Sequence, residues 1–213
     1  MLLYTNMTEN SFLYSTLTRF GDYYPLRLKN QVGSLIEDVR DNFTWVQYNP
    51  RKNIDREGLS ITSLDGGLSG KPDLDSLYEY HKETGIVLNE THFTIKTPVY
   101  KYFKQWLDPL ENYLGRTHVI RLNRGGFFPP HRDNKHSNID SFRLFLPLNY
   151  NKMQNFFLLE NNRMEFENGM LYFIDTAKMH TLFNTGETPF YFVVANVILS
   201  KESVDKTLEF LHG

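Results

Sequence analysis

The sequence predicts a mainly β protein with helices (α+β), in which helices pack on one sheet of a small barrel or two-sheet jelly roll. Short apolar segments separated by turn residues fill the chain from 117 to 199, at a spacing typical of such a core. Helical apolar patterns are concentrated before residue 115. The segment 141–149 is apolar on both faces, since Phe142 and Leu144 alternate with Phe145 and Pro147. A strand covered by helices on one side and by a second sheet on the other has this pattern.

In the first half of the N-terminal region, one helix and one strand are predicted. Apolar residues recur every three or four positions from 26 to 41, which predicts an amphipathic helix. Residues 49–55 read as a polar turn. Residues 59–64 alternate weakly, like a strand, and end at Gly66-Gly67.

Two further helices are predicted before residue 115. A short one covers 73–84, after a loop rich in Gly and Pro. A longer one opens at Thr97-Pro98, because Pro is favoured in the first helical turn. One side of this helix is apolar and carries Val99, Phe103, Trp106, Leu107, Leu110 and Leu114.

Eight short strands and a terminal helix over 201–211 complete the chain. Asn161-Asn162, Asn168-Gly169 and 186–189 supply turn signals between the strands. The predicted strands are 117–123, 127–133, 141–149, 155–160, 163–166, 170–174, 181–184 and 189–199.

The length of 213 residues predicts a single domain over 1–213. Within it, residues 1–115 form a helical and strand region that covers the core and shapes the entrance for a substrate. Residues 116–200 form the jelly-roll core, and 201–213 the terminal helix. The sequence does not indicate an oligomeric state.

Composition excludes several classes of site. A net charge of −2 with no long basic cluster predicts no nucleic-acid partner. Zero cysteines exclude disulfides, zinc–thiolate sites and iron–sulfur clusters, so a metal must be held by His, Asp, Glu or water. Neither a secretory signal nor a membrane-spanning apolar run is visible, so a cytoplasmic location is expected.

The clearest chemical motif is His131-Arg132-Asp133, followed 49 residues later by His180. Side chains two apart on an extended segment project to the same side. Two His and one carboxylate on one face, with the other positions open, are the ligands of non-haem Fe(II) oxygenases. All three residues fall at predicted strand ends, where a cavity mouth would lie.

Two plainer interpretations compete with this metal site. A lone His-x-Asp is weak evidence in a chain with seven His and 25 acidic residues, and a polar loop would explain it. His131-Arg132-Asp133 with Asn138 also has the spacing of a kinase catalytic loop. The Gly-rich loop, strand Lys and Asp-Phe-Gly of a kinase are missing, so this second interpretation fails.

From 117 onward the chain resembles the aspartyl/asparaginyl/prolyl hydroxylase group of the Fe(II)/2-oxoglutarate oxygenase superfamily. The resemblance covers roughly the last 85 to 95 residues and lies in the order and spacing of several motifs. These motifs are Ile120-Arg121-Leu122-Asn123, Gly125-Gly126, Pro130-His131-Arg132-Asp133, 142–148, Glu167-Asn168-Gly169 and 180–186. The resemblance implies a double-stranded β-helix (cupin-like) fold, Fe(II) held by His131, Asp133 and His180, and O2-dependent decarboxylation of 2-oxoglutarate.

The chain departs from this family at Phe190, where many members carry a basic residue that binds the far carboxylate of 2-oxoglutarate. Either another strand supplies the cation or 2-oxoglutarate is not the cosubstrate. Arg143 is our candidate, because it lies on an apolar strand and a guanidinium can clamp a carboxylate with two hydrogen bonds. It also matches a family Arg in the strand that ends Pro-Leu. A strand-edge Arg that reaches into water is the plainer alternative.

Four further polar residues are weaker candidates for contacts to cosubstrate or substrate. Arg121 and Asn123 share one face of the strand before the motif, and Arg121 is equally compatible with the surface. Asn184 shares a face with His180 but is equally compatible with a turn role before Gly186. His136, near the metal motif, is a candidate for touching substrate.

The resulting hypothesis is an Fe(II)/2-oxoglutarate dioxygenase that hydroxylates an amino-acid or peptidyl side chain of the Asp, Asn or Pro type. The substrate is a small molecule, peptide or protein. Two alternatives stay open: a cupin-like metal enzyme that does not use 2-oxoglutarate, and a non-enzymatic jelly-roll binding module.

Overall fold

The computed structural model describes residues 2–50, 53–133 and 139–212, so the candidate His136 lies outside the described residues. Five α-helices and three 3₁₀ helices are described within these ranges. They are α1 (Leu2–Thr18), α2 (Leu35–Asn42), α3 (Leu77–Thr84), α4 (Lys104–Leu107), α5 (Lys201–His212), η2 (Glu90–His92), η3 (Pro98–Tyr102) and η4 (Asp108–Tyr113). No helix in the described ranges has both the length and the apolar character needed to cross a bilayer.

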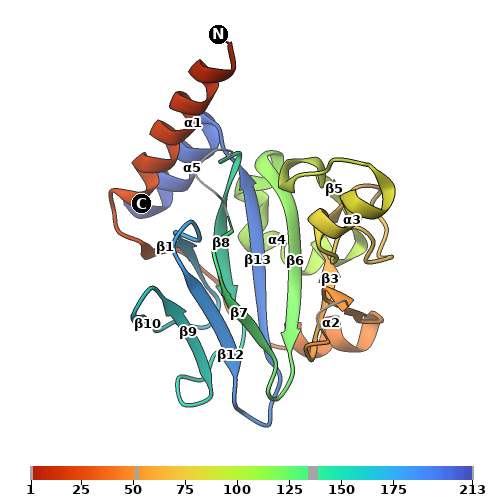
Figure 1. The fold of residues 1–213 in the computed structure, drawn as a ribbon. Coiled ribbons are helices and arrows are strands. Elements are labelled where there is room, and N and C mark those ends of the chain that lie inside the picture. The colour runs from red at the N-terminus through yellow and green to blue at the C-terminus, as the bar shows by residue number, and fades with distance from the viewer. Residues whose placement is uncertain (1, 51–52, 134–138, 213) are drawn as a thin grey trace.

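The strands form two main sheets and one small one (Figure 1). The large sheet has the order β1-β11-β8-β13-β6-β3-β2, the second sheet β10-β9-β12-β7, and the small sheet β4-β5. The strands are β1 (Tyr23–Lys29), β2 (Val46–Gln47), β3 (Arg56–Ser60), β4 (Thr62–Ser63), β5 (Ile95–Lys96), β6 (Leu114–Leu122), β7 (Phe127–His131), β8 (Ser141–Pro147), β9 (Asn155–Leu159), β10 (Asn162–Met164), β11 (Met170–Ile174), β12 (His180–Asn184) and β13 (Phe190–Ile198).

The eight strands from β6 to β13 form a double-stranded β-helix. β6, β8, β11 and β13 lie in the large sheet, and β7, β9, β10 and β12 lie in the second sheet. The chain passes repeatedly between the two sheets, and the strand pairs of this core are antiparallel. This is the jelly-roll core within an α+β fold that the sequence predicts.

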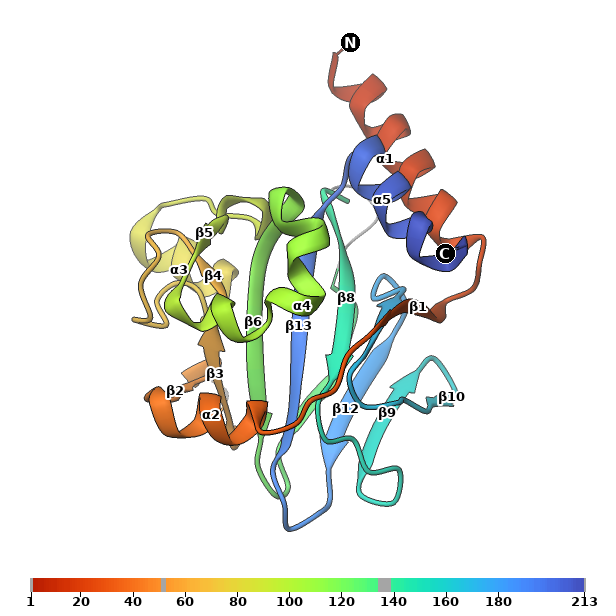
Figure 2. The ribbon, with the colours of Figure 1, turned by 180° about the vertical axis from the view of Figure 1, so that it is seen from behind.

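The large sheet is apolar on both faces because it separates two cores. On its outer face, Leu144 and Val193 pack with helical residues such as Trp106 and Leu17. On its inner face, Phe145 packs between the two sheets with side chains that include Ile120, Leu122, Phe157, Phe190 and Phe192. Figure 2 shows α2 and α4 covering the outer face of the large sheet, as the pattern of 141–149 predicts.

The predicted strands of the core and the helix over 201–211 are confirmed, with bounds that differ by at most three residues. The strand over 59–64 is divided into β3 and β4. The helix over 73–84 begins only at Leu77, because the Ser76 side chain caps it by accepting from Glu79 N–H.

Two helix predictions are wrong in part. Residues 26–29 belong to β1, an edge strand that pairs with β11, and the helix in this segment begins at Leu35. The segment after Thr97 is a series of short turns, η3, α4 and η4, where one continuous helix was predicted. Pro109 interrupts it, since proline has no N–H to donate and its ring blocks the preceding turn. The apolar side is nevertheless as predicted, and Val99, Phe103, Trp106, Leu107, Leu110 and Leu114 are buried.

Candidate metal centre

The two candidate His ligands come from adjacent strands of the second sheet. His131 ends β7 and His180 begins β12, and the two residues are direct partners in the antiparallel register. Their ring centroids lie 4.2 Å apart. Residues distant in the chain are therefore brought together by backbone pairing of two strands.

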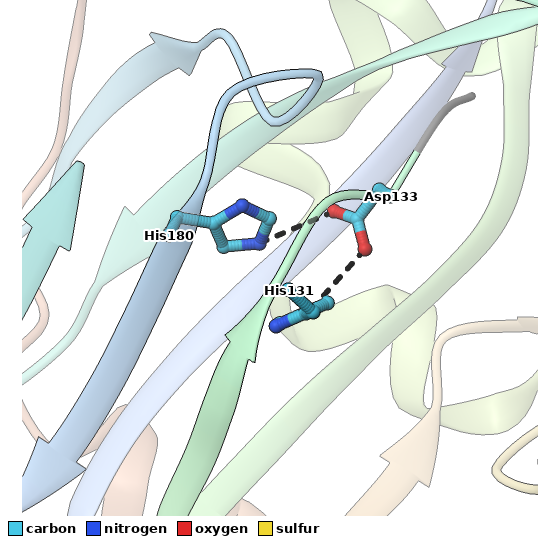
Figure 3. Close-up of side chains that lie close together, drawn as sticks. All are labelled: His131, Asp133 and His180. Carbon is cyan, nitrogen blue, oxygen red and sulfur yellow. Dashed lines mark ion pairs between the residues drawn. The ribbon is translucent and has the colours of Figure 1, made fainter. Parts of the chain in front are cut away.

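Asp133 completes the cluster from the segment directly after β7 (Figure 3). Its N–H donates to the Thr176 carbonyl at 3.0 Å, which fixes this segment beside the end of β11. Asp133 Oδ1 lies 3.3 Å from His131 Nε2, and Asp133 Oδ2 lies 3.4 Å from His180 Nε2. The three potential ligand atoms all lie within 4.8 Å of one another.

Backbone contacts set the orientation of both imidazole rings. His131 Nδ1 lies 2.7 Å from the Pro129 carbonyl, and His180 Nδ1 lies 3.0 Å from the Lys178 carbonyl. A carbonyl only accepts, so in each ring Nδ1 carries the proton that is donated. In the neutral rings both Nε2 lone pairs then face the Asp133 carboxylate, the arrangement found when histidine binds a metal.

The donor set fits a metal ion. Lone pairs that face a carboxylate at 3.3–3.4 Å repel it unless a cation or protons lie between them. Asp133 Oδ2 is also buried without any contact of hydrogen-bond geometry, among the described residues. Two imidazole nitrogens and one carboxylate oxygen on one face are the ligand set of non-haem Fe(II) sites. The arrangement can therefore hold a divalent metal and leave positions open to ligands.

Arg143 contacts the carboxylate ligand directly. Its Nη1 lies 2.5 Å from Asp133 Oδ2, although the angle does not meet hydrogen-bond criteria. The same guanidinium donates from Nε to Asn196 Oδ1 at 3.0 Å, and its Nη2 lies 3.7 Å from Glu90 Oε1. Burial alone would raise the pKa of Asp133, but the charge of Arg143 holds that pKa well below its usual range. Asp133 is therefore an anion at neutral pH.

The three ligands line a cavity of about 340 Å³ between the two sheets. One part of its wall is apolar and carries Ile120, Phe128, Phe145, Phe157, Leu182 and Phe192. Another part is polar and carries Arg56, Glu90, Arg116, His118 and Arg143. A mostly apolar cavity with a few convergent polar groups is typical of a small-molecule site.

Of the predicted cosubstrate residues, the structure brings only Arg143 to the metal ligands. Arg121 points to the other face of β6, where it pairs with Glu57 and lies over the Trp45 ring. Asn123 donates to Asp55 and Glu57. Neither of these two side chains lines the cavity.

Asn184 lies in a turn network at the opposite end of β12 from His180. Its Nδ2 donates to the carbonyls of Leu122 and Thr188 at 3.0 and 2.9 Å. Its Oδ1 accepts from Asn155 Nδ2 at 2.9 Å and from Gly186 N–H at 3.0 Å. The side chain is 1% exposed, and its polar atoms are occupied by the turn.

Phe190 lies in an aromatic cluster between the two main sheets. Its ring lies 5.0 Å from that of Phe192 and 6.0 Å from that of Tyr150, and the side chain is 1% exposed. No described residue therefore presents a cation at this strand position.

The sequence analysis missed three charged residues of the cavity wall, namely Arg56 and Glu90, which precede the core, and Arg116, which lies in its first strand. Arg56 stands in a polar run, Asp55-Arg56-Glu57, adjoining a segment that reads as a turn. Its burial follows from the pairing of β3 with β6, which no local pattern reveals. The local pattern only places Arg56 between a predicted turn and a predicted strand, which gives no signal of burial.

Some solved structures resemble this chain, although its sequence matches neither a protein-family model nor a curated protein. The chain is similar to a 2OG-Fe(II) oxygenase family oxidoreductase from Burkholderia pseudomallei, with 12% identity over 78% of this chain and 76% of that chain and a TM-score of 0.45. It is similar to a viral collagen prolyl hydroxylase from Paramecium Bursaria Chlorella virus-1, with 12% identity over 84% and 97% of the two chains and a TM-score of 0.42. A predicted oxalate decarboxylase from Thermotoga maritima has 18% identity over 44% and 74% and a TM-score of 0.34.

Proposed function

We propose that this chain is a non-haem Fe(II) dioxygenase that uses 2-oxoglutarate and hydroxylates an amino-acid or peptidyl side chain of the Asp, Asn or Pro type. One observation carries the proposal. His131, Asp133 and His180 present two Nε2 lone pairs and a carboxylate to one point at the wall of a cavity. Three protein ligands on one face leave room for a chelating 2-oxo acid and for O2.

The residues of this chain have distinct parts in the proposed reaction. Fe(II), when bound, supplies the O2 chemistry that couples decarboxylation of the 2-oxo acid to oxidation of a substrate. Arg143 orients the Asp133 carboxylate and keeps it ionised. The carbonyls of Pro129 and Lys178 hold the two rings in the metal-binding tautomer. The apolar wall around Phe128 and Phe192 keeps bulk water from the reacting atoms.

A second candidate is a metal enzyme of the same fold that does not use 2-oxoglutarate. Phe190 favours it, because the strand position that often carries the cosubstrate's cation is filled by an aromatic cluster. A buried carboxylate without a cation is strongly unfavourable. The two candidates therefore differ in whether another cation reaches the cavity.

Two measurements test the proposed function. Anaerobic titration with Fe(II) should show one site per chain in the wild type and loss of that site in Asp133→Ala. An exposed histidine, His81, provides the control variant His81→Ala, which should bind Fe(II) as the wild type does. Absence of an Fe(II) site in the wild type would point to a non-enzymatic binding module.

Succinate release decides between the two enzymes. With Fe(II), 2-oxoglutarate and air, the wild type should release succinate slowly even without its substrate, and Asp133→Ala should not. A wild type that binds Fe(II) but releases no succinate and does not bind 2-oxoglutarate would favour the second candidate.

A further inference from the structure

Arg56 is a buried cation that has no carboxylate partner among the described residues. It begins β3 and is 3% exposed. Within the described ranges, no Asp or Glu oxygen lies at ion-pair distance from its guanidinium, and burial lowers its pKa. An uncompensated charge in the interior is costly, so this position calls for an explanation.

The protein holds this guanidinium in one place. Its Nη1 donates to the Phe127 carbonyl at 3.1 Å, and its Nε donates to the Tyr48 carbonyl at 3.4 Å. The Cζ atom lies 4.3 Å from the centre of the Phe128 ring and 5.2 Å from that of the Tyr48 ring. Arginine has five N–H donors, and hydrogen bonds to the described residues use only two of the five.

Arg56 borders the cavity of the candidate metal centre. It lines the same cavity as His131, Asp133 and His180. Phe128 contacts both groups: its ring centroid lies 6.4 Å from that of His131, at an interplanar angle of 24°, and 4.3 Å from Arg56 Cζ. The guanidinium and the first candidate metal ligand therefore flank the same aromatic side chain and border one cavity.

The neighbouring wall also holds unused hydrogen-bonding capacity. Asn49 Oδ1 and His118 Nδ1 are buried and have no hydrogen-bond partner among the described residues, and both side chains line the cavity. Native proteins satisfy nearly all such atoms, often with a ligand or ordered water. This part of the cavity is thus built for a polar ligand.

The other two arginines of the cavity are already neutralised. Arg143 contacts Asp133 and Glu90. Arg116 pairs with Glu90 at 3.2 Å and donates to the carbonyls of Asp73 and Asp75 at 2.6 Å each. Arg56 alone among these three offers an uncompensated positive charge to a ligand.

We propose that Arg56 binds the far carboxylate of a dicarboxylic 2-oxo acid whose 2-oxo acid end lies at the metal ligands. The inference rests on the proposed function and deepens it, because it assigns the cation that Phe190 does not supply. Arg143, the expectation from sequence, then acts as a positioning residue on Asp133.

Binding of two 2-oxo acids to the Mn(II)-loaded, anaerobic protein tests this assignment by calorimetry. 2-Oxoglutarate has the far carboxylate, and 2-oxopentanoate has the same chain length without it. Arg56→Met should weaken 2-oxoglutarate binding by at least about 30-fold, because it removes one partner of a buried charge pair. Binding of 2-oxopentanoate should stay within about twofold of wild type, since this acid makes no such pair. The matched control Arg124→Met, at an exposed ion pair with Glu187 outside the cavity, should change neither affinity.

A stability measurement separates ligand binding from a structural role. Without metal and ligand, Arg56→Met should raise the thermal midpoint, because it replaces an uncompensated buried charge by an apolar side chain. A lower midpoint together with unchanged preference for 2-oxoglutarate would show a structural Arg56 and overturn the proposal. If Arg56→Met does not fold, Arg56→Lys decides: its preference for 2-oxoglutarate over 2-oxopentanoate should be reduced, and an unchanged preference would overturn the proposal.

Failure of this inference and failure of the proposed function give different results. A wild type that binds 2-oxoglutarate, with Arg56→Met binding it equally well, overturns only the assignment of Arg56. A wild type that binds the metal but neither 2-oxo acid overturns the proposed function and the inference with it.

Discussion

His131 and His180 are direct cross-strand partners in β7 and β12, with ring centroids 4.2 Å apart. The geometry of the metal centre therefore depends on the register of two strands, and a slip by one residue would turn one ring away from the other. Metal binding and the pairing of these strands should stabilise each other, because a ligand that binds only the folded state shifts the folding equilibrium.

Removal of a single ligand should abolish this coupling. His180→Ala should weaken Fe(II) binding by more than the about 10–100-fold typical for loss of an outer-shell partner, because it removes a direct donor. Fe(II) should then no longer raise the thermal midpoint, whereas it should raise that of the wild type. Scanning calorimetry under anaerobic conditions, at several Fe(II) concentrations, measures the thermal midpoint and, from its rise, the Fe(II) affinity. His81→Ala is the control. An undiminished metal-dependent rise in His180→Ala would exclude this residue as a ligand.

The contact between Asp133 and Arg143 should contribute more to the free energy of unfolding than to the affinity for a metal. Arg143→Met leaves a buried carboxylate without its cation, and we expect it to lower the free energy of unfolding of the metal-free protein by about 3 kcal/mol. The double variant Asp133→Asn/Arg143→Met should be more stable than the sum of the single losses implies, because the two residues interact. Urea unfolding of the four proteins gives the coupling energy. Additive losses would mean that the 2.5 Å contact contributes no coupling.

His118 should make the protein sensitive to mild acid. Burial lowers its pKa well below the usual value, and the charges of Arg116 and Arg143 act in the same direction. The unfolded chain takes up a proton at this ring near pH 6.5, while the folded protein does not. Below about pH 6.5, the free energy of unfolding should therefore fall by up to about 1.4 kcal/mol per pH unit.

The variant His118→Leu tests that dependence. It should reduce the slope of the free energy of unfolding against pH between about pH 6.5 and about pH 5, because the proton-binding difference is removed. His81→Ala, at an exposed position, should keep the wild-type slope. Equal slopes in His118→Leu and wild type would contradict the assignment of acid sensitivity to this ring.

Asn184 should behave as a structural residue. Asn184→Ala removes four hydrogen bonds of a buried amide, and we expect a loss of about 3 kcal/mol in the free energy of unfolding. Affinity for Fe(II) and for 2-oxoglutarate should not change, since the side chain does not line the cavity. Urea unfolding and calorimetric titration measure the two effects separately. A stable variant with weakened 2-oxoglutarate binding would instead favour a cosubstrate role.

The sequence predicted the eight core strands well because their signals are local. Turn pairs such as Asn168-Gly169 and alternating apolar runs mark each strand without reference to distant residues. The helix over 26–41 was wrong in its first half for the opposite reason: pairing with β11 overrides an apolar spacing that suits a helix. The strand break at Ile61 likewise depends on packing that the pattern does not contain. The interruption after Thr97, by contrast, has a local signal in Pro109, which the prediction of one continuous helix overlooked.

In the candidate site, too, the features with local signals could be predicted and those that depend on distant strands could not. The candidate ligand set could be predicted because it consists of sequence features. These are His131 and Asp133 at a short spacing and a second histidine, His180, near the start of a predicted strand. The contact of Arg143 with Asp133 and the burial of Arg56 could not be predicted in this way, since each depends on how strands from different parts of the chain meet. Phe190 was noticed as a departure, but only the fold shows that aromatic rings fill the space around it.

The position of β6 between β3 and β13 has a consequence for biosynthesis. β6 is central in the large sheet, yet one of its two partners is the last strand of the chain. During translation, one edge of β6 and one edge of β8 therefore stay unpaired until β13 has left the ribosome. Pairings between distant segments form slowly, and unpaired strand edges favour aggregation. Successful expression of this protein should accordingly depend on chaperone capacity and on a slow rate of synthesis.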